Sequence, residues 1–287
     1  MLQLFTDTSA NLPVALTKQH HITVVPFSYT VDGKETDYPD DADFDGAAFY
    51  GAMRRGAVVK TSMVNPDLMA NYFERALSQG DDVLYVGMSG GISGTAHAAA
   101  LAAEELREKY PHAKIMTIDT YAASLGEGLQ VLEAAELLRA GRSFEEVGDR
   151  ILARRPHMCQ FFTVDDLNHL KRGGRINAAT ALFGTMLAIK PVMHVDDEGR
   201  LIPVSKARGR KASLTALVDR MEATAIDPAG QTVFISHGDC LEDAEFVAGE
   251  VRRRLGVETV HINYVGPVIG NHSGPGTMAL FFLGSER

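Results

Sequence analysis

Tryptophan is absent from this 287-residue sequence, and aromatic residues make up only 7% of it. Little material therefore exists for the aromatic platforms on which nucleic-acid bases stack. Positive charge is also scarce, because the formal net charge is −9. Since proteins bind nucleic acids through basic patches, both shortages argue against a nucleic-acid partner. The only cysteines, Cys159 and Cys240, fit neither a disulfide spacing nor a C-x-x-C motif, and we interpret both as buried or half-buried thiols.

Long hydrophobic runs are missing too. No apolar run approaches the ~20 residues that a membrane span needs, and no basic segment leads into an apolar core at the N-terminus. We therefore expect a cytoplasmic protein without a membrane span. The histidines do not recur at metal-ligand spacing, so no metal site is expected. No G-x-x-x-x-G-K-[ST] motif occurs, and Gly126-Glu127-Gly128 lies in a helical pattern without a third glycine, so no nucleotide cofactor is expected.

The length of the chain exceeds the usual size of a single hydrophobic core, so two domains are expected. Pro156 marks a boundary between domains 1–155 and 156–287. In the first domain, strand-like segments alternate with helical ones, which predicts an α/β domain with a mostly parallel sheet and flanking helices. In the second, residues 192–195 and 201–204 form a predicted antiparallel hairpin, so a mixed sheet with helices is expected there. Local signals predict a further hairpin around Asp32-Gly33, a capping box at Ser143, and helices over residues 177–187 and 241–255.

Residues 83–95 combine an unbroken apolar strand with a turn rich in glycine and serine, and an Ala-rich helix follows directly. Binding crevices in open α/β sheets form beyond the carboxyl ends of the strands. Helix N-termini there carry free N–H groups and a partial positive charge, so an anion is the expected ligand. Ser93 is the best-placed N-cap residue of the helix.

The same stretch contains Gly87-Met88-Ser89-Gly90-Gly91, a G-x-S-x-G motif between a strand and a helix. That context is typical of a hydrolase nucleophile elbow, with Ser89 as the nucleophile. Two features weaken this alternative. Several loop residues separate Ser89 from the helix, whereas an elbow turns into its helix almost at once. No His-Gly-Gly-type oxyanion segment precedes the motif.

Other polar segments also follow predicted strands. Lys60-Thr61-Ser62 is predicted as a hydroxyl-bearing loop, and residues 171–175 as a basic, glycine-hinged loop. Residues 206–211 are predicted as a basic turn. Near the C-terminus, His272 lies in a glycine-rich loop over residues 270–276, whose backbone is free to approach a ligand closely. Such loops can be mere caps and turns, but their convergence favours a binding site.

Taken together, these motifs resemble one family, the DegV proteins, which include the fatty-acid-binding subunits of bacterial fatty acid kinase. The matching segments run in order along nearly the whole chain. They are residues 7–13 (DTSANLP), 60–62 (KTS), 92–95 (ISGT), 119–128, 170–176 (LKRGGRI), 189–191 (IKP), 208–212 (RGRKA) and 272–276 (HSGPG).

The resemblance implies a two-domain protein that holds one long-chain fatty acid in an apolar tunnel, with the carboxylate at the domain interface. The residues expected to bind the carboxylate are Thr61, Ser62, Ser93, Gly94 and His272. Arg175 and Arg208 match two further family motifs and would serve the carboxylate end of the ligand, phosphotransfer or kinase docking. The sequence departs from the family pattern at Met63, where glutamine is common, and at Gly90, where a second serine is common.

The implied role is that of a carrier and not of an enzyme. A separate ATP-dependent kinase would phosphorylate the bound carboxylate, and an acyltransferase is a further candidate partner. A module that reads the bound lipid as a signal would differ only in its partner. Burial of a sixteen-carbon chain at about 0.8 kcal/mol per CH₂ gives roughly 11 kcal/mol before ordering costs, so tight retention needs no covalent link. The sequence does not determine chain length, unsaturation, oligomeric state or the identity of the kinase.

Overall fold

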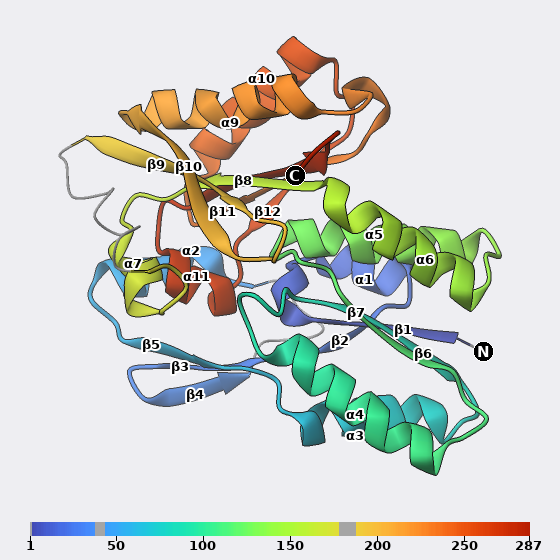
Figure 1. Ribbon diagram of the computed structural model, residues 1–287. Helices are drawn as coiled ribbons and strands as arrows, with labels where there is room; N and C mark the ends of the chain where they lie inside the picture. The colour runs from blue at the N-terminus through green and yellow to red at the C-terminus, as the bar shows by residue number, and fades with distance from the viewer. Residues whose placement is uncertain (1, 38–43, 178–187) are drawn as a thin grey trace.

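Strands and helices alternate through the first half of the chain, as predicted, and build a parallel sheet (Figure 1). The structure, a computed structural model, describes residues 2–37, 44–177 and 188–287. In this sheet the strand order is β2-β1-β6-β7, and every neighbouring pair is parallel. Its strands are β1 (Leu2–Asp7), β2 (Thr23–Val25), β6 (Asp82–Gly87) and β7 (Ile115–Asp119). Their carboxyl ends meet at one edge of the sheet, where we expect ligands.

Helices cover both faces of the parallel sheet (Figure 1). On one face, Phe73 of α3 and Ala99 of α4 share a core with Val83 of β6. On the other, Val131 of α5 and Ile151 of α6 pack with residues of β1, β6 and β7. The helices of this half include α1 (Val14–Gln19), α3 (Pro66–Leu77), α4 (Thr95–Lys109), α5 (Leu125–Arg139) and α6 (Phe144–Arg154). The capping box predicted at Ser143 is confirmed at the start of α6.

A small antiparallel sheet, in the order β4-β3-β5, lies beside the first. Strands β3 (Ser28–Val31) and β4 (Lys34–Asp37) form the hairpin predicted around Asp32-Gly33. Helix α2 (Gly46–Arg54) follows, and then β5 (Val59–Ser62). The prediction that residues 60–62 form a loop is wrong, because they pair with β3. The strand places alternate side chains on opposite faces, so Thr61 and Ser62 point in different directions.

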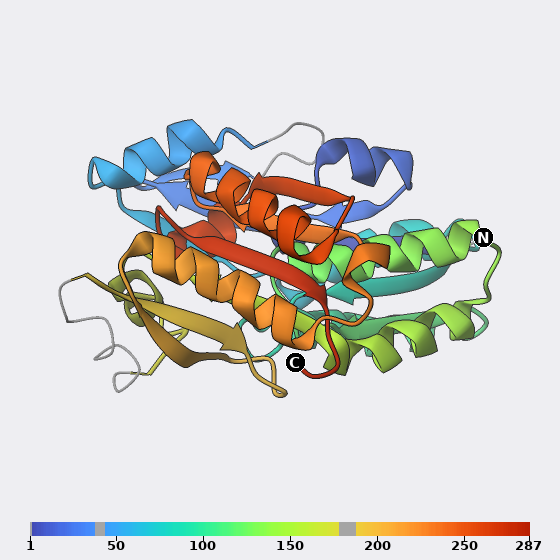
Figure 2. The same ribbon diagram turned by 90° about the horizontal axis from the view of Figure 1, so that it is seen from above.

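The second half of the chain builds a mixed sheet in the order β10-β9-β8-β13-β11-β12. Helices α9 (Arg210–Thr224) and α10 (Leu241–Leu255) lie side by side over one face of it (Figure 2). The predicted hairpin is confirmed and longer than expected, since β9 and β10 extend through residues 189–208. The strands of the mixed sheet are β8 (Met158–Thr163), β9 (Ile189–Val195), β10 (Leu201–Arg208), β11 (Val233–His237), β12 (Val260–Tyr264) and β13 (Met278–Leu283).

Several local predictions for this half are wrong. The basic turn at 206–211 is split between the end of β10 and the start of α9 (Arg210–Thr224), with only Gly209 between them. Residues 171 and 172 end the short helix α7 (Asn168–Arg172), and the glycine-rich loop at 270–276 is largely helix α11 (Pro267–Ser273). Helix α10 (Leu241–Leu255) has the predicted bounds. A helix predicted over 177–187 lies almost entirely outside the described residues.

Helix α5 lies between the two large sheets and is buried on all sides over its first seven residues. Its glycines allow this close packing. A Cβ at Gly128 would lie 2.6 Å from the carbonyl oxygen of Ala10, and one at Gly126 would lie 2.8 Å from Gln160 Oε1. The fold is therefore the expected α/β arrangement, with α5 joining the parallel and the mixed sheet. The boundary at Pro156 stays a prediction.

Candidate functional site

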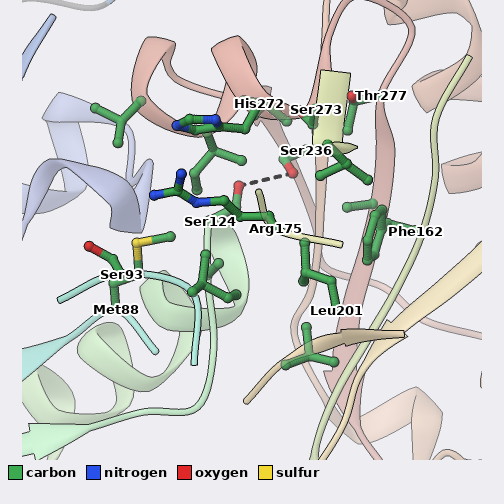
Figure 3. Close-up of a pocket in the computed structure, with 18 of the residues that line it drawn as sticks. Met88, Ser93, Ser124, Phe162, Arg175, Leu201, Ser236, His272, Ser273 and Thr277 are labelled. Atoms are coloured by element: carbon green, nitrogen blue, oxygen red, sulfur yellow. Dashed lines mark hydrogen bonds between the residues drawn. The ribbon is translucent and has the colours of Figure 1, made fainter. Parts of the chain in front are cut away.

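A cavity of about 260 Å³ lies between the carboxyl edge of the parallel sheet and the mixed sheet. Both halves of the chain contribute to it, because its wall draws on the loop after β6, the start of α5, β8, β13 and α11. Most of the wall is apolar. Its larger apolar side chains include Phe27, Ile92 and Phe281, together with Met88, Phe162 and Leu201, which are labelled in Figure 3. An elongated apolar ligand suits such a wall better than a polar one.

Polar side chains gather at one end of this cavity. Strand β5 brings Thr61 there, and α11 brings His272, whose Nε2 lies 3.0 Å from Thr61 Oγ1. Arg175 reaches the same region from the turn after α7. A carboxylate at this end would meet hydroxyl groups, an imidazole and one guanidinium, which together can replace the hydrogen bonds it loses from water.

Burial and the nearby charge of Arg175 lower the pKa of His272 to about 4. The ring is therefore neutral at pH 7 and offers one N–H donor and one acceptor nitrogen. Burial also lowers the pKa of Arg175, but an arginine stays protonated throughout the ordinary pH range. Arg175 thus supplies positive charge at this end of the cavity, while His272 supplies hydrogen bonds.

The N-cap residue of α4 is Gly94, so the prediction of Ser93 as the cap is wrong by one residue. The chain makes one more turn residue than expected before the helix begins. Ser93 Oγ still accepts the N–H of Thr95 at 3.3 Å and lies 2.9 Å from Thr95 Oγ1. Since both Ser93 and Gly94 line the cavity, the positive end of this fifteen-residue helix faces it.

Five of the seven residues predicted for the ligand or its phosphorylation line this cavity: Thr61, Ser93, Gly94, Arg175 and His272. The other two do not. Ser62 is exposed on the opposite face of β5, and Arg208 is exposed at the end of β10. Fold topology separates these two from the rest, although sequence motifs group all seven. The roles of all seven stay predictions.

A second cavity, of about 820 Å³, adjoins the polar end and shares Thr61, Arg175 and His272 with the first. Its further polar lining includes Lys60, His169 and Arg172. The charged side chains that line it are all cationic among the described residues, although the chain as a whole carries a net charge of −9. Anions are therefore attracted to this opening.

Ser89 has the bonding of a structural serine. Its buried hydroxyl donates to the carbonyl oxygen of Gly199 at 2.8 Å and accepts the N–H of Gly91 at 3.1 Å. A nucleophilic serine needs a base that takes its proton. A main-chain carbonyl cannot do this, so the geometry does not favour the hydrolase alternative.

The sequence reasoning missed a buried acidic cluster beneath the site. Ser9 Oγ lies 2.5 Å from Asp7 Oδ1 and 2.6 Å from Glu127 Oε2, and Tyr85 donates to Asp7 Oδ2 at 2.6 Å. Ser9 has one hydroxyl proton for two carboxyl groups, so one carboxyl group must itself be protonated. Burial raises the pKa of both carboxyl groups, and that of Glu127 rises further because it accepts fewer hydrogen bonds and lies near the charge of Asp7, so we assign the proton to Glu127. The sequence did contain one signal of this burial, because Glu127 lies between two glycines in a helical pattern.

We compare the free energy of unfolding of Glu127→Gln with that of the native protein. The difference should shift in favour of the variant by about 1 kcal/mol or more when the pH is raised from 5 to 8. The native contribution of Glu127 is complete below the unfolded pKa of about 4.5 and is lost as pH rises toward the raised folded pKa. Glutamine cannot ionise and escapes this loss. Urea unfolding at both pH values measures the difference, with Glu136→Gln, exposed on the same helix, as the control. Equal effects of the two variants at both pH values would show that Glu127 ionises freely.

His272 gives a pH effect of the opposite sign. Its folded pKa of about 4 lies below the unfolded value of about 6.5, so its contribution to stability is complete above pH 6.5 and is lost as pH falls toward 4. In ligand-free protein we expect His272→Gln to reduce this acid-induced loss by about 2 kcal/mol. Unfolding curves between pH 4 and 7 test this, with exposed His112→Gln as the control. Parallel curves for native protein and His272→Gln would contradict it.

Among residues 2–37, 44–177 and 188–287, no helix is both long and apolar enough to cross a membrane. Within the same ranges, no three or more histidine, cysteine, aspartate or glutamate side chains are grouped so as to hold a metal ion.

Comparison with known proteins gives a consistent family. The family model described as "Uncharacterised protein, DegV family" matches residues 1–285. A DegV domain-containing protein of Clostridium perfringens is 42% identical over 99% of this chain and 98% of its own, and one of Lactococcus lactis is 36% identical over 98% and 97%. A DegV family protein of Thermus thermophilus, described as binding a fatty acid, is 32% identical with a TM-score of 0.87 over 99% of both chains.

A second solved structure, a fatty-acid-binding DegV family protein of Streptococcus agalactiae, is 28% identical, with a TM-score of 0.84 over 100% of this chain and 99% of its own. These matches span the whole described fold, including both large sheets and the cavity between them. The predicted resemblance is thus confirmed, and the chain belongs to the DegV family.

Proposed function

We propose that this protein binds one long-chain fatty acid and presents its carboxylate to a separate ATP-dependent kinase, which forms the acyl phosphate. The observation that carries the proposal is the cavity, which is mostly apolar along its length and has a polar end formed by Thr61, Ser93, Arg175 and His272. Fatty acid binding by relatives in Thermus thermophilus and Streptococcus agalactiae supports the same ligand class.

The physical chemistry of the cavity suits retention of the ligand. Each CH₂ removed from water contributes about 0.8 kcal/mol, so a long acyl chain outweighs the cost of ordering it. The carboxylate would accept hydrogen bonds from Thr61 and Ser93 and lie near the positive charge of Arg175. These contacts offset its desolvation and leave the ligand noncovalently bound.

Presentation to a kinase is supported by the second cavity. Because it adjoins the polar end and is lined by Lys60, Arg172 and Arg175, a nucleotide phosphate could approach the carboxylate through it. A carboxylate oxygen would attack the terminal phosphorus of ATP, forming acyl phosphate and releasing ADP. The partner kinase would supply the nucleotide site and the metal. An acyltransferase that consumes the acyl phosphate is a second candidate partner.

Native mass spectrometry of protein purified from cells tests the first half of this proposal. We expect a complex one fatty acid heavier than the chain, and organic extraction should release that acid. A mass equal to the bare chain after expression in several hosts would refute fatty acid binding.

Reconstitution with fatty acid kinase catalytic subunits tests the second half. We expect ATP-dependent acyl phosphate only when the loaded protein, the kinase and a divalent metal are all present. If no such kinase phosphorylated the acid bound to this protein, presentation to a kinase would be refuted. The alternative of a module that reads the bound lipid as a signal would then be favoured. Labelling with a fluorophosphonate probe tests the alternative of a serine hydrolase, and no label on Ser89 is expected.

A further inference from the structure

The apolar part of the cavity contains hydroxyl groups that a carboxylate at the polar end does not need. Ser124, Ser236 and Ser273 all line this cavity. In Figure 3 the hydrogen bond between Ser124 and Ser236 lies between Ser93 and His272 on one side and the apolar Phe162 and Leu201 on the other. The hydroxyl groups thus interrupt an otherwise apolar wall.

The side-chain amide of Asn11 decides which hydroxyl group donates in the hydrogen bonds of Ser124 and Ser236. Its Oδ1 accepts the N–H of Gly266 at 3.2 Å, and its Nδ2 donates to the carbonyl oxygen of Thr8 at 3.0 Å, which fixes the orientation of the amide. Ser124 Oγ lies 2.8 Å from the same Oδ1 and must donate its single proton there. The 3.1 Å bond between Ser124 and Ser236 therefore uses the proton of Ser236. Ser236 keeps free lone pairs on the cavity side.

Ser273 is the unsatisfied member of the group. It is 4% exposed, and its hydroxyl has no hydrogen-bond partner among the described residues. Nearby Thr277 also lines the cavity, but its hydroxyl proton already bonds the carbonyl oxygen of Gly274 at 2.7 Å. Among these serine and threonine hydroxyl groups, that of Ser273 is therefore the free donor, and acceptor lone pairs lie free beside it on the other hydroxyl oxygens. A buried hydroxyl without a partner is costly, so a bound group is expected to satisfy it.

The backbone of Ser124 is held in an unfavourable conformation. Its φ of 55° and ψ of −143° lie in a region that glycine adopts almost exclusively. The bonds to Asn11 and Ser236 fix its hydroxyl in this position. Strain of this kind persists where the surroundings require one geometry, and it is frequent at ligand sites.

We propose that the cavity accepts a fatty acid that carries a hydroxyl group along its chain. The ligand hydroxyl would accept the free proton of Ser273 and donate its own proton to Ser236. A hydroxyl matches this wall because it is both donor and acceptor. An unsubstituted chain would leave Ser273 unpaired or paired only with a trapped water. This inference rests on the proposed function, since it concerns the same cavity and ligand class.

Calorimetric titration of delipidated protein tests the proposal, using palmitic acid and a series of palmitic acids with one hydroxyl at successive positions. At most positions the hydroxyl should weaken binding about 10-fold or more, because it is buried without a partner. At one position, or two neighbouring ones, the hydroxylated acid should bind at least as tightly as palmitic acid.

One variant and its control test whether Ser273 causes this preference for one hydroxyl position. Ser273→Ala should weaken binding of the favoured hydroxylated acid about 10-fold and leave palmitic acid binding equal or tighter. Ser213→Ala is the matched control, because Ser213 is a buried serine of α9 whose hydroxyl bonds within its own helix. If the hydroxyl weakened binding to a similar extent at every position, and Ser273→Ala did not change this, only this inference would be overturned. A bound water would then be the partner of the serine hydroxyl groups. Failure of palmitic acid itself to bind would overturn the proposed function as well.

Discussion

Replacing Thr61 by valine and Ser93 by alanine together should weaken palmitate binding by at least about 100-fold. The variant removes both hydroxyl groups at the polar end of the cavity while preserving the shape of residue 61. Hydrogen bonds to a charged group contribute about 1.5–3 kcal/mol each, so the loss of two exceeds the 2.7 kcal/mol or so that corresponds to 100-fold. Calorimetric titration of delipidated protein measures the effect.

Ser62→Ala is the matched control for this experiment. Ser62 neighbours Thr61 on β5 but is exposed on the other face of the strand, so its loss should leave the affinity unchanged. Single variants at Thr61 and Ser93 should each give an intermediate effect. If the double variant bound palmitate as tightly as Ser62→Ala does, the carboxylate would lie elsewhere in the cavity.

Gly173→Ala should disrupt the polar end without touching any side chain of the apolar wall. A Cβ at this position would lie 2.3 Å from His272 Nδ1 and 3.1 Å from its Cγ. The imidazole ring would have to turn away, which would break its contact with Thr61. We expect palmitate affinity to fall at least about 10-fold, because one head-group contact is lost and the cavity mouth is reshaped.

Nuclear magnetic resonance of the His272 ring and palmitate titration measure the two consequences of Gly173→Ala. Gly249→Ala is a suitable control, since a Cβ there would meet nothing within 4 Å and should stabilise α10 slightly. An unshifted His272 resonance in Gly173→Ala, together with native affinity, would show that α7 can move away from α11 at no cost to the site.

Much of the local structure was predictable because it depends on short-range chemistry. The capping box at Ser143, the hairpin at Asp32-Gly33 and the bounds of α10 follow from side-chain caps, turn preferences and a 3.6-residue apolar period. The errors occur where a short polar or apolar segment fits several structures. Residues 60–62 become a strand because β3 pairs with them, and α11 forms from a glycine-containing segment that packs against α7 and β5.

Strand β13 illustrates the same limit. No strand is predicted over residues 278–283, although they form a continuous apolar run. In the structure this strand lies in the middle of the mixed sheet, between β8 and β11. A short apolar run is compatible with a buried strand or a buried helix, and only the partners on both sides decide between them.

The sequence alone predicts the α/β class and the parallel first sheet, and its family motifs include most of the residues that line the polar end. Each of these depends on residue type and spacing along the chain. By contrast, packing in three dimensions puts Thr61 and Arg175 on the cavity wall and leaves Ser62 and Arg208 off it. It also joins Asp7 and Glu127 through the Ser9 hydroxyl and leaves Ser273 Oγ without a hydrogen-bond partner among the described residues. Such pairings join residues far apart in the chain, so they depend on how sheets and helices pack and leave no periodic signal in the sequence.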